Sequence, residues 1–190
     1  MVKQVAIVLV ALLAVLAGIV SLQPSEFAVE RAIEIRAPAA AVIGHIENVH
    51  AWEAWSPWHR MDPEMKLTYE GPESGPGAAY AWDGPSIGRG RMTVMEVTPE
   101  RVETKLEFLA PMAGTNRGVF TLEPAGDDAT RLTWRMEGQN GFVAKAFALV
   151  MSMDQMIGSE FEHGLATLKE LAENEARGAR NADPPAPAGT

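Results

Sequence analysis

The chain has 190 residues, of which 47% are hydrophobic, with a formal net charge of −9 and no cysteine. This length fits one domain with short additional segments. The negative charge disfavours nucleic acid as a partner, because neutralising phosphates requires clustered Lys and Arg, and the lack of cysteine excludes disulfides and thiolate chemistry.

The first segment is an apolar run, VAIVLVALLAVLAGIVSL, at residues 5–22. These eighteen uncharged residues would form a helix about 27 Å long, close to the hydrocarbon thickness of a bilayer. Lys3 precedes the run and Glu26 follows it. The positive-inside rule then predicts a single-pass membrane protein with a cytoplasmic N-terminus and an extracytoplasmic domain, periplasmic in a Gram-negative cell.

The alternative is a cleaved signal peptide, after which the domain would be secreted. A retained anchor is favoured, because the run exceeds the usual signal core of about 7–15 residues and no Ala-x-Ala sequence lies near its end. We therefore expect a transmembrane anchor at residues 1–24 and a soluble domain at residues 25–176. The Ala-, Pro- and Gly-rich residues 177–190 are predicted to form a disordered tail.

The domain begins with a predicted strand and a helix. Apolar and polar residues alternate over residues 27–35, which is typical of a half-buried strand, with Arg31 as the one charge on its apolar side. Pro38 suits the first position of a helix that continues to Val49. An aromatic cluster around Pro57 follows this helix; it consists of Trp52, Trp55 and Trp58.

The middle of the chain predicts a meander of antiparallel strands separated by Gly- and Pro-containing turns. The expected strands are 66–70, 78–82, 88–97, 102–108, 118–122 and 130–136. After Gly141 the apolar period changes to three and four residues, which predicts one long amphipathic helix over residues 142–175. A sheet with one apolar face and one long helix indicates an α+β fold.

Several local motifs add to this order of elements. They are Trp55-Ser56-Pro57-Trp58, Tyr69-Glu70-Gly71-Pro72, Trp82-Asp83-Gly84, Gly88-Arg89-Gly90-Arg91-Met92, Leu132-Thr133-Trp134 and Phe161-Glu162-His163-Gly164-Leu165. With these motifs the chain resembles the START-like, helix-grip (SRPBCC) superfamily, in particular its polyketide cyclase/dehydrase-like branch with an N-terminal membrane anchor. The resemblance covers about residues 26–172.

The resemblance implies a curved antiparallel sheet wrapped around the C-terminal helix, with a cavity between them. Members of the superfamily bind lipids, sterols, hormones or aromatic polyketides, and only some are enzymes. A fold of this kind therefore implies a pocket for a hydrophobic molecule and does not by itself imply a reaction.

Strand alternation and helix periodicity select the side chains that would line this cavity. The expected ligand-binding residues are Trp58, Tyr80, Trp82, Phe108, Phe120, Trp134, Met136, Phe147, Met151 and Asp154. Apolar stripes of this kind more often form a solid core than a pocket. The ten methionines favour a pocket, since Met lines adaptable binding surfaces.

Among polar candidates, Asp154 lies between apolar residues of the predicted helix. If it faced the cavity, desolvation would raise its pKa and it could act as a general acid or base; otherwise it would be exposed to solvent. His59 would lie near the mouth of the cavity. Further candidates for polar groups in the pocket are Arg91, Asn116, Gln139 and Arg135, the last of which is expected on the outer face.

The four histidines have no metal-binding spacing, so we expect neither a metal site nor a cofactor, and no catalytic residue is assigned. The favoured hypothesis is a membrane-tethered domain that binds a hydrophobic small molecule, either a lipid or an aromatic metabolite. One alternative is an enzyme of the cyclase/dehydrase kind, in which Asp154, His59 or Arg91 assists proton transfer. The other is a structural or partner-binding module.

Overall fold

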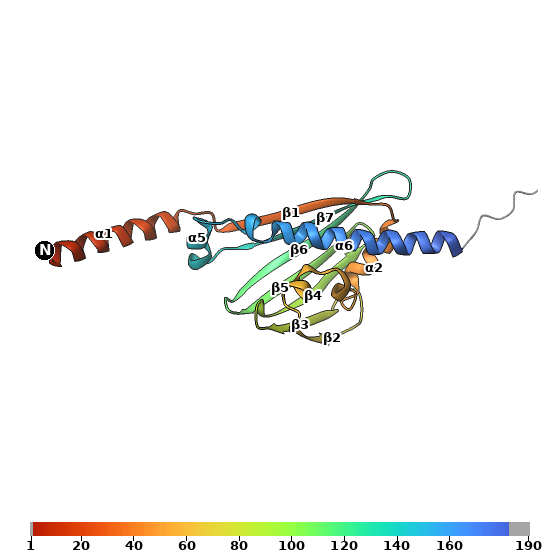
Figure 1. Ribbon diagram of the computed structural model, residues 1–190, viewed down its shortest axis with the longest axis horizontal. Helices are drawn as coiled ribbons and strands as arrows, with labels where there is room; N and C mark the ends of the chain where they lie inside the picture. The colour runs from red at the N-terminus through yellow and green to blue at the C-terminus, as the bar shows by residue number, and fades with distance from the viewer. Residues whose placement is uncertain (1, 183–190) are drawn as a thin grey trace, which may run out of the picture.

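The computed structural model describes residues 2–182, which form an antiparallel sheet crossed by a long C-terminal helix (Figure 1). In chain order the elements are α1 (Val2–Ser21), β1 (Glu26–Ile35), α2 (Ala39–Glu47), α3 (Trp52–Trp55), α4 (Pro57–Met61), β2 (Lys66–Glu70), β3 (Ala79–Gly84), β4 (Gly88–Thr98), β5 (Arg101–Ala110), β6 (Gly114–Pro124), β7 (Thr130–Gln139), α5 (Phe142–Ala148) and α6 (Met153–Ala182).

The seven strands form one sheet in the order β1-β7-β6-β5-β4-β3-β2, and every neighbouring pair is antiparallel. Strands β2 to β7 therefore make a meander, and β1 pairs with β7 at the far edge. This arrangement confirms the predicted α+β helix-grip fold. All predicted strands are present, and β6 is longer at both ends than the expected residues 118–122.

The alternation of side chains gives the sheet an apolar inner face and a charged outer face. On β7, Leu132, Trp134 and Met136 are buried, whereas Arg131 and Arg135 are exposed. The inner face packs against α6, whose buried residues recur along one side of the helix. The C-terminal segment is amphipathic, as predicted, and the apolar side of α6 holds the helix on the sheet.

Aromatic side chains fill the centre of the space between the sheet and α6. The ring of Phe161 on α6 is stacked on that of Trp134, with centroids 3.9 Å apart. The ring of Phe120 stacks on that of Trp134, with centroids 5.2 Å apart. The rings of Trp52 and Trp55 contact those of Phe120 and Trp134 edge-on. The indole N–H groups of Trp52 and Trp55 donate to backbone carbonyls of α2, so the polar atom of each of these two buried side chains has a hydrogen-bond partner.

A second contact ties the start of α6 to β1. Arg31 projects from the apolar side of β1 and donates to Asp154 at 2.7 Å and to Glu162 at 2.6 Å. Gly158 lies between these two carboxylates on the helix, and a Cβ there would overlap the Arg31 guanidinium. A glycine inside a helix costs about 1 kcal/mol relative to alanine, and here it makes room for the arginine.

The prediction of one continuous helix over residues 142–175 is wrong, because the chain turns between α5 and α6. Ser152 begins the second helix: its Oγ accepts from the Gln155 N–H, and its own N–H donates to Gln155 Oε1. This reciprocal pair is a capping box, which defines a helix N-terminus. The apolar period runs across the break at residues 149–151 and therefore did not reveal it.

The C-terminal boundary also differs from the prediction. Helix α6 continues to Ala182, so residues 177–182, expected to be part of a disordered tail, are helical. Residues 183–190 of that expected tail lie outside the described residues. At the other boundary, Pro38 is the residue before α2 and not its first helical position.

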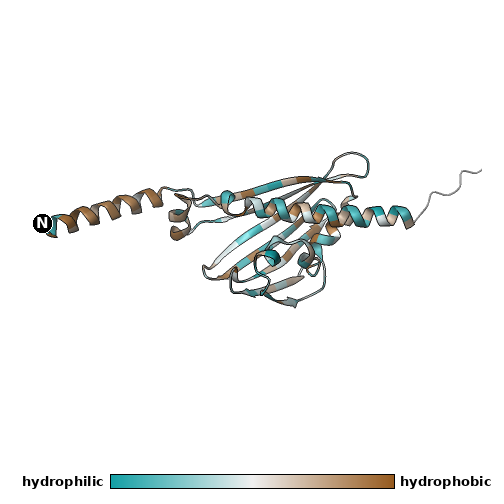
Figure 2. Ribbon diagram, in the orientation of Figure 1, coloured by the Kyte–Doolittle hydropathy of each residue, from teal (hydrophilic) through white to brown (hydrophobic). Residues whose placement is uncertain are grey.

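Helix α1 extends away from the domain and is apolar on all sides (Figure 2). It is long and apolar enough to cross a membrane, a criterion that an N-terminal signal sequence also meets. Val20 is its only buried residue, and every residue of the main core lies between Val29 and Ala176. The core of the described residues is therefore complete without α1, and we expect residues 23–190 to fold on their own.

Replacing Phe161 with alanine should lower the free energy of unfolding of the 23–190 domain by about 3–5 kcal/mol, since it leaves a cavity beside Trp134. Chemical denaturation measures this change. The matched control is Met156→Ala on the exposed side of the same helix, for which a change within about 0.5 kcal/mol is expected. Equal losses for both variants would contradict the central role given to the stacked rings.

The Arg31 contact predicts a pH dependence of stability. Arg31 holds the pKa of Asp154 below its usual value, chiefly by hydrogen bonding. The stabilisation is therefore present above the unfolded pKa of about 3.9 and is lost as the pH falls through the folded value. Unfolding of the domain at pH 7 and at successively lower pH should show wild type and Asp154→Asn converging in acid. In an Arg31→Met background, Asp154→Asn should have no such pH-dependent effect.

Candidate ligand-binding site

Most of the side chains expected to line a cavity belong to the packed core. Tyr80, Trp82, Phe120, Trp134 and Met136 are all at most 8% exposed and touch other core residues. Trp58 and Phe108 are half-buried and pack against the same cluster. At the centre of the sheet–helix interior these aromatic rings therefore contact one another.

Trp82 carries an unusual polar atom in this core. Its ring lies over Gly90, where a Cβ would overlap the indole, and its centroid is 5.6 Å from that of Phe108. Within residues 2–182 its buried Nε1 has no hydrogen-bond partner. Buried indole N–H groups usually have a partner, so among the described residues this donor is an unsatisfied polar group in the core.

Phe147 and Met151 lie apart from the core, at the end of the domain where α1 joins. Both are at least half exposed and line an apolar pocket of about 440 Å³. The pocket lies between α5, the start of α6, the turn between β5 and β6, and the chain that leaves α1. Its other lining residues are Gln23, Pro24, Glu26, Phe27, Met112, Asn140, Ala144, Ala148, Ser152, Met153 and Met156.

This pocket adjoins the packed core of the sheet–helix interior. Phe27, on the inner side of β1, and Met153, at the start of α6, line the pocket and also pack against the core. We name it the α5 pocket. Sequence reasoning selected Phe147 and Met151 but missed Met112 and Met156, which belong to it. The uncharged residues 109–116 and the capping box at Ser152 were the available signals.

Asp154 does not have the environment that a general acid requires. Its side chain is 52% exposed and bound to the Arg31 guanidinium, which lowers the carboxyl pKa. Asp154 therefore follows the alternative of an exposed side chain, and the condition for a raised pKa is not met. Its partner Arg31 comes from β1, 123 positions away. Asp154 instead anchors α6.

The other candidates for proton transfer lie on separate parts of the fold. Burial lowers the pKa of His59 on α4, and within the described residues neither of its ring nitrogens has a hydrogen-bond partner. Arg91 projects from the outer face of the sheet and pairs with Glu70 at 3.0 Å. Among residues 2–182 no group of three or more His, Asp and Glu side chains is arranged to hold a metal ion.

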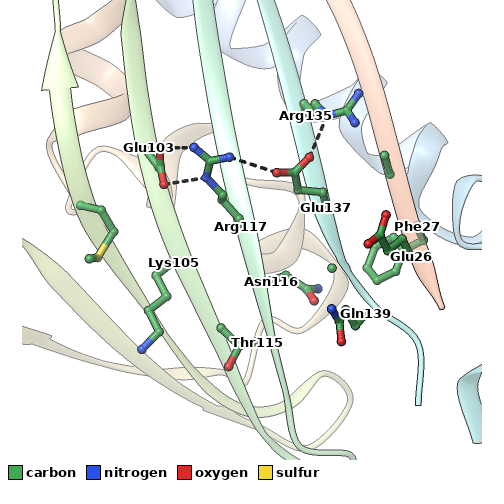
Figure 3. Close-up of a pocket in the computed structure, with 13 residues that line it drawn as sticks. Glu26, Phe27, Glu103, Lys105, Thr115, Asn116, Arg117, Arg135, Glu137 and Gln139 are labelled. Atoms are coloured by element: carbon green, nitrogen blue, oxygen red, sulfur yellow. Dashed lines mark hydrogen bonds and ion pairs between the residues drawn. The ribbon is translucent and has the colours of Figure 1, made fainter. Parts of the chain in front are cut away.

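A second hollow, of about 720 Å³, lies over the outer face of the sheet and is shown in Figure 3. Ion pairs cross it from strand to strand: Arg117 binds Glu103 at 2.6 Å and Glu137 at 3.1 Å, and Arg135 binds Glu137 at 3.1 Å. Arg117 lowers the pKa of Glu103. Gln139 and Arg135 line this hollow and not the α5 pocket, and Arg135 is on the outer face as predicted. Asn116 also borders the hollow, but its amide lies 3.8 Å from the Sδ atom of Met136 on the inner side of the sheet.

The charges in this outer hollow are matched. Each Arg named above is paired with a Glu, so the ladder presents little net charge to an incoming ion. Exposed ion pairs of this kind contribute at most about 1 kcal/mol each. The outer face is therefore a solvated surface, and the α5 pocket is the better candidate for a hydrophobic ligand.

Comparisons with solved structures support the fold. Protein CV1439 from Chromobacterium violaceum matches with a TM-score of 0.54 and 17% identity, over 79% of this chain and 99% of that one. A protein from Nitrosospira multiformis matches with a TM-score of 0.56 and 20% identity, over 80% of this chain and 99% of that one.

A third similar structure is StfQ, described as a di-domain ARO/CYC from the steffimycin biosynthetic pathway. It matches with a TM-score of 0.56 and 14% identity, over 80% of this chain and 53% of that one. At these identities the three likenesses show the fold alone. A search of curated proteins found no match.

The sequence model of one family, described as polyketide cyclase / dehydrase and lipid transport, matches residues 26–173. The match spans the sheet, the aromatic core and all but the last turns of α6, and it begins where β1 begins. It agrees with the resemblance carried by the tryptophan and glycine motifs. The chain therefore belongs to the polyketide cyclase/dehydrase and lipid transport family.

Proposed function

We propose that this chain is a membrane-tethered binding domain for a hydrophobic small molecule, either a lipid or an aromatic metabolite. The observation that carries the proposal is the α5 pocket, which lies at the α1 end of the sheet–helix interior. The family description, which names both cyclases and lipid transport, supports a hydrophobic ligand for this domain.

The pocket has the size and lining that such a ligand needs. Its volume of about 440 Å³ lies within the range of small-molecule sites, about 300–1,000 Å³. Four methionines contribute to its wall, and their flexible side chains adapt to ligands of different shape. Its few polar residues, among them Asn140 and Ser152, would orient a polar group at one end of the ligand.

The tether would bring this pocket close to a bilayer. Helix α1 ends at Ser21, and Gln23 and Pro24 already line the pocket. A ligand that partitions into the membrane is therefore favoured over one dissolved in water. With the positive charge of Lys3 at the start of α1, the proposed topology places the domain on the extracytoplasmic side. Cleavage of a signal sequence would release the domain and leave its core unchanged.

Catalysis of the cyclase/dehydrase kind is the second candidate, favoured by the imidazole of His59, which has no hydrogen-bond partner among the described residues and whose pKa is lowered by burial. Proton transfer usually requires the base to lie within hydrogen-bond reach of the reacting group. His59 does not line the α5 pocket, and Asp154 is bound to Arg31. The geometry therefore supports binding better than catalysis.

Filling the pocket should weaken binding. Ala144 on α5 lines the pocket, and Ala144→Trp should lower the affinity of the 23–190 domain for the apolar fluorophore N-phenyl-1-naphthylamine by about tenfold, equivalent to about 1.4 kcal/mol. Fluorescence titration of the purified domain in detergent-free buffer measures this affinity.

Val143→Trp is the matched control, because Val143 lies next in the same helix but is exposed and does not line the pocket. Its affinity should equal that of wild type. Equal weakening in both variants would indicate a general effect on α5. The absence of saturable binding by the wild-type domain would overturn the proposed function.

A further inference from the structure

The exposed apolar side chains of the domain gather at one end. Between residues 23 and 182, eleven large hydrophobic side chains are exposed, and only Met61 and Met95 lie elsewhere. The other nine belong to α5, the residues around it, the end of β5 and the turn between β5 and β6. We name this set the apolar tip: Leu109, Met112, Phe142, Val143, Phe147, Leu149, Val150, Met151 and Met156.

The apolar tip also lacks charge, unlike the rest of the domain surface. Residues 109–116 carry no charged side chain, and residues 138–153 carry only Lys145. These two segments are distant in sequence, yet Met112 and Phe147 line the same pocket. A contiguous apolar surface of this kind on a soluble domain usually marks a contact with a membrane or a partner.

The position of α1 indicates which contact this is. Helix α5 touches α1, and Val20, in the last turn of α1, is buried. Figures 1 and 2 show α5 at the end of the domain from which α1 leaves, and both helices are apolar. If α1 crosses a bilayer, its last turn lies at the membrane interface, and α5 beside it lies at the same depth.

We propose that the apolar tip inserts into the surface of the bilayer that α1 crosses, so that the α5 pocket opens into lipid and not into water. This inference rests on the proposed tether. The occupant is a lipid surface because the tip is continuous with α1 and is held beside it by the same chain. With Lys145 as the one charged residue in the two segments that form the tip, and a net charge of −9, insertion depends on apolar burial and little on anionic headgroups.

The arrangement would give the pocket a route for its ligand. Phe147 and Met151 belong both to the tip and to the pocket wall, so an inserted tip places the pocket mouth among acyl chains. A ligand dissolved in the leaflet could then enter without crossing water. Transfer of an apolar chain through water would cost about 0.8 kcal/mol for each exposed methylene.

The absence of cysteine from the sequence allows a direct test with the full chain in phosphatidylcholine vesicles. Nitroxide labels on Val150→Cys in the tip, Leu13→Cys in α1 and Asp127→Cys in the β6–β7 turn report local exposure to oxygen and to a water-soluble nickel chelate. Relative to the label at 127, the oxygen-to-nickel accessibility ratio at 150 should rise about tenfold, since interfacial helices are buried about 5–10 Å.

Each outcome is distinct. If the label at 150 is as accessible to nickel as that at 127 while the label at 13 lies in lipid, the tip does not insert and this inference fails, whereas the tether stands. If the label at 13 is also in water, the tether and the inference both fail. Spectral broadening at 150 that disappears on dilution with unlabelled chains would show that a second copy of the chain contacts the tip. This result would also overturn the proposal that the tip contacts a lipid surface. The fluorescence titration of ligand binding by the isolated domain does not depend on any of these three outcomes.

A variant of the 23–190 domain provides a second measurement. Val143→Glu with Val150→Glu changes two tip residues that do not line the pocket and should lower partitioning into phosphatidylcholine vesicles about tenfold, equivalent to about 1.4 kcal/mol. The matched control, Met61→Glu with Met95→Glu, changes two exposed apolar residues away from the tip and should leave partitioning unchanged. Equal loss in both pairs, or binding that salt abolishes, would overturn the inference.

Discussion

The stacking of Phe161 on Trp134 is the contact on which the rest of the domain depends. It places the one long helix over the centre of the sheet, and Phe120, Trp52 and Trp55 close around the same pair of rings. Gly164 permits this approach, since a Cβ there would lie 2.9 Å from Pro57 and 3.3 Å from the Trp134 ring. The centre of the interior is therefore occupied by the protein's own side chains.

Because the centre is filled, open space remains toward one end. The Arg31 contact fixes the first turns of α6 against β1, and the capping box at Ser152 starts the helix there. The preceding α5 must then turn away, which leaves the α5 pocket between the two helices and Phe27. The polar contacts near the start of α6 thus determine where an apolar pocket can exist.

The fold could be predicted from the sequence because both of its main signals are local. Alternation along residues 27–35 and 102–108 defines strands and their faces, and the wide apolar stripe of α6 defines the helix that covers them. The observed registers agree with this alternation, since a shift of one residue would turn every buried side chain outward.

The site could be predicted only in part, for two physical reasons. An inward-facing tryptophan has the same sequence pattern whether it lines a cavity or fills it, so Trp134 could not be distinguished from a ligand contact. The partner of Asp154 comes from a strand 123 residues away, and no local pattern shows that Arg31 reaches it. Phe147 and Met151 continued the apolar period across the break, which concealed the separate helix to which the pocket belongs.

The connection between α1 and β1 has one more consequence. Only residues 22–25 separate the two elements, and four extended residues span at most about 14 Å. With α1 as an anchor, the domain could not leave its membrane to deliver cargo elsewhere. Its supply of ligand would then depend on the number of ligand molecules per lipid in that one leaflet, and exchange would become a search in two dimensions in which the protein and its ligand diffuse in the same plane.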